Sequence, residues 1–356
     1  MNKEIDKDGK DKERPNPADY HFIDLYGEIA IKSDGQIAGE QFTVEKCKEC
    51  CILLLDHLAS VNIDDCEECL IVTGPCSGSV FIRDCKNTTL FTICQQFRSR
   101  DCTNTDVFLF CATKPIIESS KLMRFRSLAL SYNKLEAHIM KASLSPFTNY
   151  WNSIHDFTPE DIPNFEICLT EYDKIKKMSM VENIGSVKFN PELSVLSLYT
   201  IANEVTGKKM LILCMERNKE TLVSFYGRIL KFLRDILARG AQLIATRDII
   251  IRKKECPSLF ISKKQAQLSG QKIPVDFRKL SFAPLFKPRQ EIKLWERLIG
   301  DHPNGRLITL EIACNREQIE ESVRMVGDMM EIVEDSDFEH LRTNLYQFAQ
   351  MQTDIS

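Results

Sequence analysis

A fourfold internal repeat limits the possible folds of this chain more than any other feature. The repeats are marked by Cys47, Cys66, Cys85 and Cys102, so the steps between them are 19, 19 and 17 residues. A short apolar run follows each of these cysteines, at 52–55, 70–72, 90–93 and 107–110. A period near 19 with β-type runs and polar corners is typical of a solenoid in which each repeat forms one coil of three short strands.

Stacked coils place equivalent residues above one another, in rows that we call ladders. One ladder would hold the four cysteines above, and a parallel ladder would hold Cys50, Cys69, Thr88 and Thr105. A single coil cannot bury its own apolar face, so three or more coils are needed for stability. The repeat therefore predicts a parallel β-helix from about residue 36 to 120, which residues 115–157 would cap.

The cysteines also allow a metal site. Ten of the 14 lie between Cys47 and Cys111, and the two Cys-x2-Cys pairs that begin at Cys47 and Cys66 have the spacing of a zinc ribbon. The later repeats put Thr88 and Thr105 where the second cysteine would stand, and threonine is a poor zinc ligand. We therefore predict reduced core thiols and no metal, with zinc as the alternative.

The remainder of the chain has a different pattern. Strand-like runs at 209–215, 242–251 and 306–314 alternate with helix-like runs at 218–239 and 315–330. This order predicts a ferredoxin-like α/β domain. The expected organisation is a flexible tail (1–19), a β-helix domain (20–160), a linker (161–195) and a C-terminal domain (196–356) with an insertion at about 252–305.

Charge and hydropathy narrow the class of protein. The net charge is −4, which gives no reason to expect a nucleic-acid partner. No apolar run approaches the roughly 18 residues of a membrane span, and the first residues do not form a signal peptide, so we expect a cytoplasmic protein. The segment 247–297 has 13 Lys/Arg against 5 Asp/Glu. It is either a solvated basic loop or a surface for acidic partners or lipid headgroups.

The most unusual polar residues follow the third apolar run, as Gln95-Gln96-Phe97-Arg98-Ser99-Arg100. Residues two apart in a strand face the same way, so Gln96, Arg98 and Arg100 would share one face of a stiff stack. From the residues alone, this segment is either a solvated corner or a site presented to a partner.

These residues resemble a known family. The segment resembles the Gln-x-x-Arg signature of the tubulin cofactor C domain superfamily, and within it the X-linked retinitis pigmentosa protein 2 family. The matching segments lie within residues 20–160, and a weaker likeness extends to Leu345–Gln352. They are Ala38–Phe42, Gly78–Phe81, Cys94–Cys102, Cys111–Ser120 and Ile154–Pro159.

The resemblance implies a right-handed β-helix followed by a nucleoside-diphosphate-kinase-like domain. It also implies a GTPase activator, rather than an enzyme with its own substrate, that acts on the GTP form of an Arf-like small GTPase in ciliary trafficking of lipidated cargo. Arg98 would be the arginine finger, and Gln95 and Gln96 would lie beside the nucleotide. Arg100, Glu118 and Phe157 would contact or support the partner. GTP and Mg²⁺ would belong to the partner, and this chain would need no cofactor of its own.

Two alternatives and one departure accompany this interpretation. The chain could bind the GTP-bound GTPase as a non-catalytic effector or scaffold, or it could be a tubulin-folding cofactor. The family's acylation signal is missing, because the sequence begins Met1-Asn2 without a glycine or a nearby cysteine. We therefore expect a monomer in the cytoplasm, with the ciliary base as a second location, and we do not expect attachment to the plasma membrane.

Overall fold

The computed structural model describes residues 16–168, 207–216, 219–252, 304–315, 330–333 and 338–353, with a few positions between 181 and 205. They belong to two compact units, the first built mainly from residues up to 188 and the second mainly from residues after it. Within the described residues, no helix is long and apolar enough to cross a membrane.

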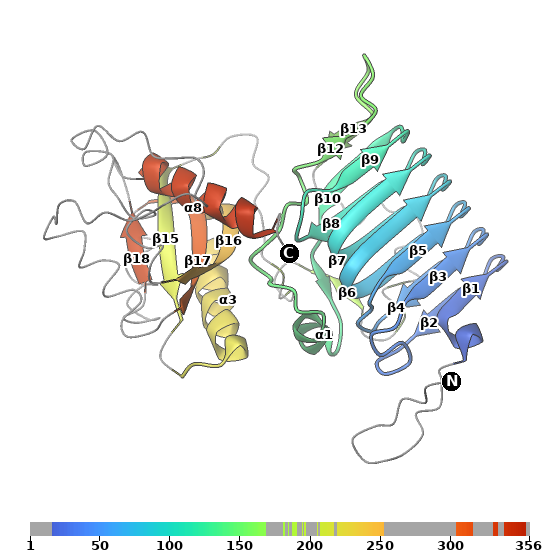
Figure 1. The fold of residues 1–356 in the computed structure, drawn as a ribbon, viewed down its shortest axis with the longest axis horizontal. Coiled ribbons are helices and arrows are strands. Elements are labelled where there is room, and N and C mark those ends of the chain that lie inside the picture. The colour runs from blue at the N-terminus through green and yellow to red at the C-terminus, as the bar shows by residue number, and fades with distance from the viewer. Residues whose placement is uncertain are drawn as a thin grey trace, which may run out of the picture. The chain divides into compact units, whose positions relative to one another are not determined.

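The first unit is a parallel β-helix whose strands stack coil upon coil (Figure 1). One side of the stack, the first side, contains β1, β3, β5, β9, β12 and the second halves of β6 and β7. The second side contains β2, β4, β8, β10, β13 and the first halves of β6 and β7. After the short 3-10 helix η1 (Pro17–Tyr20), the strands are β1 (His21–Ile23), β2 (Ile29–Lys32), β3 (Phe42–Glu45), β4 (Cys51–Leu54), β5 (Val61–Asp64), β6 (Leu70–Arg83), β7 (Thr89–Arg100), β8 (Asp106–Cys111), β9 (Ile116–Glu118), β10 (Met123–Ser127), β12 (His155–Asp156) and β13 (Phe165–Ile167).

The corners that follow β1, β3, β5, β6, β7 and β9 each contain two residues in the left-handed region of backbone conformation. In the corner after β6 these are Asp84 and Asn87, with φ of 54° and 52°. Asp and Asn tolerate this region better than most residues that have a Cβ, which explains the polar corners of the repeat. Equivalent pairs occur in the neighbouring coils, at Asp24 and Gly27, Lys46 and Glu49, Asp65 and Glu68, Asp101 and Asn104, and Ser119 and Leu122.

The predicted cysteine ladder is present, and its thiols bond to the backbone. Cys66 Sγ lies 3.3 Å from the carbonyl of Asp64, and Cys69 Sγ lies 3.3 Å from the carbonyl of Cys47 in the preceding coil. Thr88 occupies the position of Cys69 one coil later, and its hydroxyl donates to the carbonyl of Lys86 at 3.0 Å. Cysteine and threonine thus fill the same role as small, buried donors to corner carbonyls.

The β-helix is longer than the repeat predicted. A complete coil, β1 with β2, precedes residue 36, and residues 116–127 form another coil where a cap was expected. Ser120 continues the cysteine ladder there, because its hydroxyl accepts from the backbone N–H of Cys102 at 3.2 Å. The helix α1 (Leu135–Lys141) follows this coil, and β11 (Leu130–Ser131) pairs with β14 (Lys188–Phe189) in a separate small sheet.

The second unit contains a four-stranded antiparallel sheet in the order β16-β17-β15-β18. Its strands are β15 (Lys208–Met215), β16 (Gln242–Arg252), β17 (Asn304–Cys314) and β18 (Met330–Val333), and its described helices are α3 (Leu222–Ala238) and α8 (Phe338–Thr353). The three predicted strands are present. Most of the predicted helix at 315–330 and most of the insertion lie outside the described residues, and Met330, the last residue of that helix, instead begins β18. The ferredoxin-like and kinase-like assignment stays a prediction.

The N-terminus of α3 differs from the sequence-based expectation. Asn218 was expected to cap this helix, but Thr221 is its N-cap, and the Thr221 hydroxyl accepts from the backbone N–H of Ser224 at 3.2 Å. A threonine in this position satisfies one of the free N–H groups of the first turn. At the other end, Gly240 has a φ of 89° and ends the helix as predicted.

Candidate functional site

The predicted site residues of β7 project from the first side of the β-helix. Gln96, Arg98 and Arg100 alternate with the buried side chains of Phe97 and Ser99. Arg98 and Arg100 are exposed, and Gln96 is half-buried. The Gln96 side-chain oxygen accepts from the Ser79 hydroxyl of the neighbouring coil at 3.2 Å. The alternation expected from the sequence is therefore the one that the structure has.

Register between the coils brings the other predicted residues beside them. Arg98 stacks between Phe81 and Ile116, and Arg100 is opposite Glu118. The backbone N–H of Phe157 donates to the carbonyl of Ile117 at 2.9 Å. Since Ile117 directly precedes Glu118, this bond places Phe157 beside Glu118 in the next coil. Arg100, Glu118 and Phe157 thus occupy successive coils of one outward ladder, directly beside the ladder of Arg98.

Phe157 is one of the most exposed large apolar side chains of this unit. It is 59% exposed. Its ring meets the ring of His155 edge-on, with 4.7 Å between the centroids. His155 in turn lies next to Ile116, in the ladder that contains Arg98. An exposed aromatic pair at the margin of a charged face is a common feature of protein-binding surfaces.

The charges of this face are unevenly paired. Arg83 makes a two-point ion pair with Asp64 of the preceding coil, at 2.6 and 2.8 Å. Arg100 lies 3.3 Å from the carboxylate of Asp101. Within the described residues the Arg98 guanidinium has neither an ion pair nor a hydrogen bond. Arg98 is therefore the cation of this face whose bonding capacity is open to an incoming group.

Gln95 lies apart from the other five residues, at a bend of β7. The strand pairs with β8 up to Cys94 and with β9 from Arg98 onward. The Gln95 carbonyl accepts from the Thr113 hydroxyl at 2.9 Å, which anchors the bend. Its side chain is half-buried. The two glutamines therefore lie in different parts of β7: Gln95 is at the bend, and Gln96 begins the segment that pairs with Ser79 of β6.

The interior behind Arg98 is closely packed. Phe97 and Ile117 are almost completely buried, and the Phe97 ring meets Phe125 edge-on at 5.9 Å. Under Arg100, the hydroxyls of Ser99 and Ser120 lie 3.2 Å apart in the buried interior. Because these side chains pack against the neighbouring coils, the backbone of β7 has little freedom to move. An arginine that acts on a partner has to be held in place by such a rigid strand.

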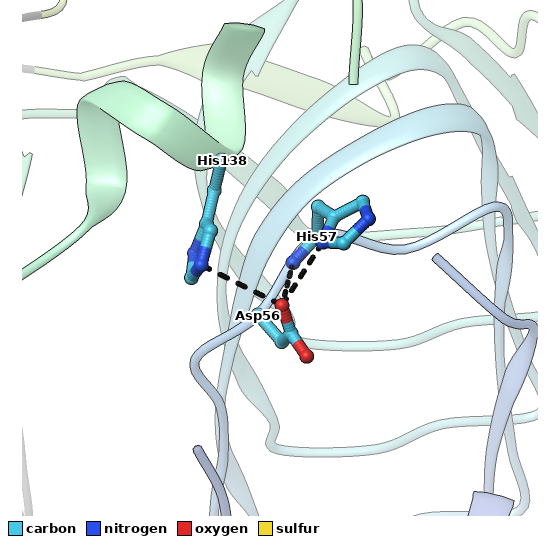
Figure 2. Close-up of side chains that lie close together, drawn as sticks. All are labelled: Asp56, His57 and His138. Atoms are coloured by element: carbon cyan, nitrogen blue, oxygen red, sulfur yellow. Dashed lines mark hydrogen bonds and ion pairs between the residues drawn. The ribbon is translucent and has the colours of Figure 1, made fainter. Parts of the chain in front are cut away.

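A largely buried cluster that the sequence did not indicate lies where the turn after β4 meets α1. Asp56, His57 and His138 come together there, as Figure 2 shows. Their potential ligand atoms lie within 4.8 Å of one another, and within the described residues they form the one such group of three possible metal ligands. His138 comes from α1, and its Nε2 lies 3.5 Å from Asp56 Oδ1 and 2.9 Å from Asp34 Oδ1.

Hydrogen bonds saturate the Asp56 carboxylate. Oδ2 accepts from the backbone N–H groups of Gly35, Ile37 and Ala38 at 2.7–3.0 Å. Oδ1 accepts from the backbone and the ring of His57 at 2.8 and 3.0 Å. Burial by itself would raise the pKa of Asp56, but these donors outweigh it and hold the pKa below the ordinary value of 3.8. The hydrogen-bonding capacity of the Asp56 carboxylate is therefore used within the protein, and the cluster has a structural role: it connects the loop after β2, the turn after β4 and α1. No sequence pattern signals it, because His138 and Asp34 are 104 residues apart.

Comparison with known proteins places the face of Arg98 in a known domain. Residues 39–157 match the family model of tubulin binding cofactor C. The human Protein XRP2 is 34% identical over 262 residues, which is 71% of this chain and 72% of that protein. The chicken Protein XRP2 is 34% identical over 69% of each chain. The chain belongs to the XRP2 family.

Two further likenesses are more local. The zebrafish member of the XRP2 family is 48% identical over 148 residues, which is 42% of this chain and 39% of that protein. The solved tubulin binding cofactor C of Leishmania major matches 40% of this chain and 87% of its own, with 21% identity and a TM-score of 0.29. All six predicted site residues lie within the segment that the family model matches.

Proposed function

We propose that this member of the XRP2 family activates GTP hydrolysis by an Arf-like small GTPase and supplies Arg98 in trans as an arginine finger. The observation that carries the proposal is the state of Arg98. It is exposed on a rigid strand, inside the matched domain, and unpaired within the described residues while Arg83 and Arg100 have carboxylate partners. GTP and Mg²⁺ are the substrate and the metal of the partner.

The chemistry suits an arginine. Negative charge develops on the β- and γ-phosphate oxygens as GTP is hydrolysed, and a positioned guanidinium stabilises it. An arginine finger increases the rate by about 10³–10⁵-fold. At about 1.36 kcal/mol per factor of ten, this corresponds to roughly 4–7 kcal/mol. A lysine has one point charge instead of a planar fork of donors, so it would reproduce little of this effect.

The surrounding residues would then have separate tasks. Arg100, Glu118 and Phe157 form a ladder beside Arg98 and offer charged and apolar contacts to the GTPase. Gln96 lies on the same face of β7, toward the nucleotide in this proposal. Gln95, at the bend of β7, would contact the edge of the same docking surface. Because all of them sit on one packed stack, docking would cost little conformational freedom.

The proposal is tested by single-turnover GTP hydrolysis across a panel of Arf-like GTPases, with binding measured on the same samples. We expect faster hydrolysis with at least one GTPase, preferential binding of its GTP form, and weaker binding by Phe157→Ala. A panel in which no GTPase hydrolyses GTP faster would contradict the proposal.

The ladder of Arg100, Glu118 and Phe157 also favours a second candidate, a non-catalytic effector. These exposed residues offer a docking surface that does not depend on Arg98. An effector would bind the GTP form of the GTPase and leave its hydrolysis rate unchanged, so the same experiment separates the two candidates. On the family resemblance we also propose a role in the trafficking of lipidated cargo to cilia, tested by the ciliary content of such a cargo after loss of the chain.

A further inference from the structure

The first coil of the β-helix has an open edge. Within the described residues, β1 pairs only with β3, and β2 pairs only with β4 (Figure 1). The carbonyls of Glu28 and Lys32 accept from Cys51 and Leu55 of the second coil at 2.9 and 2.7 Å. Backbone groups alternate in direction along a strand, so Ile29 and Ile31 direct their N–H and C=O groups toward the open edge.

Exposed apolar side chains gather on the same coil. Ile29 is 49% exposed and Ile31 is 39% exposed. Ile23 and Tyr26, in the same coil, are 37% and 65% exposed. The equivalents of Ile29 and Ile31 in the second coil, Cys51 and Leu53, are completely buried or nearly so. An unpaired strand that exposes two isoleucines is an apolar edge of the kind that pairs with another strand.

We propose that β2 pairs with β2 of a second copy of this chain, in antiparallel register centred on Ala30. The sequence Glu28-Ile29-Ala30-Ile31-Lys32 is complementary to itself in this register. Glu28 of each copy lies opposite Lys32 of the other, and Ile29 lies opposite Ile31. Opposite charges directly across an antiparallel pair are stabilising, and like charges are destabilising.

The hydrogen-bonding pattern fits the same register. In an antiparallel pair, hydrogen-bonded and non-hydrogen-bonded residue pairs alternate. Ile29 and Ile31 point their backbone groups outward, so the two Ile29–Ile31 pairs become the hydrogen-bonded ones. Ala30 and the Glu28–Lys32 pairs then become non-hydrogen-bonded, in which side chains lie closer together. If the register shifted by one residue, backbone groups that point to the open edge would lie opposite groups that point to β4, and these hydrogen bonds could not form.

The charge pattern favours a second copy over an unrelated extended peptide. The segment has an acid at one end and a base at the other, so in the antiparallel arrangement each charged residue meets the opposite charge of the second copy. The proposal departs from the monomer expected from the sequence. It concerns a different part of the β-helix from Arg98, which pairs with Phe81 and Ile116 in later coils.

Sedimentation velocity of the full chain over about 1–300 μM tests the proposal, because small interfaces associate weakly. We expect a concentration-dependent monomer–dimer equilibrium. Glu28→Lys and Lys32→Glu each place like charges opposite one another at two positions of the dimer. Each variant alone should therefore associate at least about tenfold more weakly than the wild type. The double swap Glu28→Lys with Lys32→Glu restores complementarity and should restore the dimer.

Mixing gives the sharpest result. The Glu28→Lys chain carries two lysines and the Lys32→Glu chain carries two glutamates, so the two variants should pair with each other while each stays monomeric alone. Thermal melting of each variant checks its fold. A wild type that is monomeric at every concentration, or single variants that dimerise as the wild type does, would overturn the proposal. GTPase stimulation by the monomeric variants should be unchanged, which separates this result from the proposed function.

Discussion

At the scale of single residues, the inner corner of each coil requires a small hydrogen-bond donor. Cys69 donates to the carbonyls of Cys47 and Glu67, and Thr88 donates to those of Cys66 and Lys86. Where a thiol of this unit lies deeper still, as at Cys76, burial raises its pKa to about 12. The Cys76 thiol is therefore protonated at neutral pH, and in this form it donates to the carbonyl of Ala59.

This role predicts the outcome of exchanging the two residue types. Cys69→Thr should lower the free energy of unfolding by less than about 1.5 kcal/mol, because the hydroxyl can donate to the same two carbonyls. Cys69→Val, which has a similar size but no donor, should cost about 1 kcal/mol more because it removes the side-chain hydrogen bond to these carbonyls. Urea unfolding measures both.

The same variants decide between a ladder and zinc. If Cys47, Cys50, Cys66 and Cys69 held a zinc ion, Cys69→Thr would release it and unfold the domain. Metal analysis of the purified wild type and of Cys69→Thr, beside the unfolding curves, would reveal this. A stoichiometric metal that is lost in the variant would contradict the ladder.

The residue scale also shows what the sequence could predict. Arg98, Arg100 and Gln96 were placed correctly on one face, because strand alternation is a local rule. Glu118 and Phe157 were assigned to the partner surface from the family resemblance, and their positions beside these residues came from the strand register of the structure. The tie between Asp56, His57 and His138 could not be predicted, because α1 meets the β-helix through a contact between residues distant in sequence, and no repeat encodes it.

At the scale of elements, the corners determine how the coils turn. The corners after β1, β3, β5, β6, β7 and β9 each use two left-handed residues, and Asp84 with a φ of 54° is an exposed example. The repeat revealed four of these corners because a cysteine follows the first left-handed residue. The outermost coils escaped notice, since Leu25 and Ser120 stand where the cysteine would be.

Substitution of Asp84 tests the corner geometry. Asp84→Val should lower the free energy of unfolding by about 1–2 kcal/mol, because a β-branched residue is strained in the left-handed region. Asp84→Gly should be neutral or slightly stabilising at the corner itself, since glycine adopts this conformation freely. Lys86→Val is the matched control, an exposed residue of the same corner with ordinary backbone geometry. Equal losses in Asp84→Val and Lys86→Val would contradict the account.

At the scale of the whole β-helix unit, a buried carboxylate ties α1 and the loop after β2 to the stack. Asp56 receives hydrogen bonds from that loop and from His57, which keep its pKa below 3.8 despite burial. A carboxylate with a depressed pKa contributes stability above its ordinary pKa. That stability is lost as the pH falls through the lower value in the folded state.

The tie predicts a specific pH dependence. Asp56→Asn should lower the free energy of unfolding at pH 7 by about 1–3 kcal/mol, because an amide cannot accept from all these donors. Its stability should also decline less steeply than that of the wild type between about pH 5 and pH 2. Asp65→Asn, at an exposed corner, is the control and should match the wild type in both respects. Parallel pH profiles for wild type and Asp56→Asn would contradict this role.

We propose that the stacked coils hold Arg98 toward the nucleotide of a partner GTPase. The most direct test is the single-turnover rate of GTP hydrolysis at saturating amounts of the chain, for wild type, Arg98→Ala, Arg98→Lys and the control Lys86→Ala. We predict that Lys86→Ala stimulates as the wild type does. Both Arg98 variants should bind the GTPase yet lose about 10³-fold or more of the stimulation. Stimulation by Arg98→Ala at the rate of the wild type would contradict the claim.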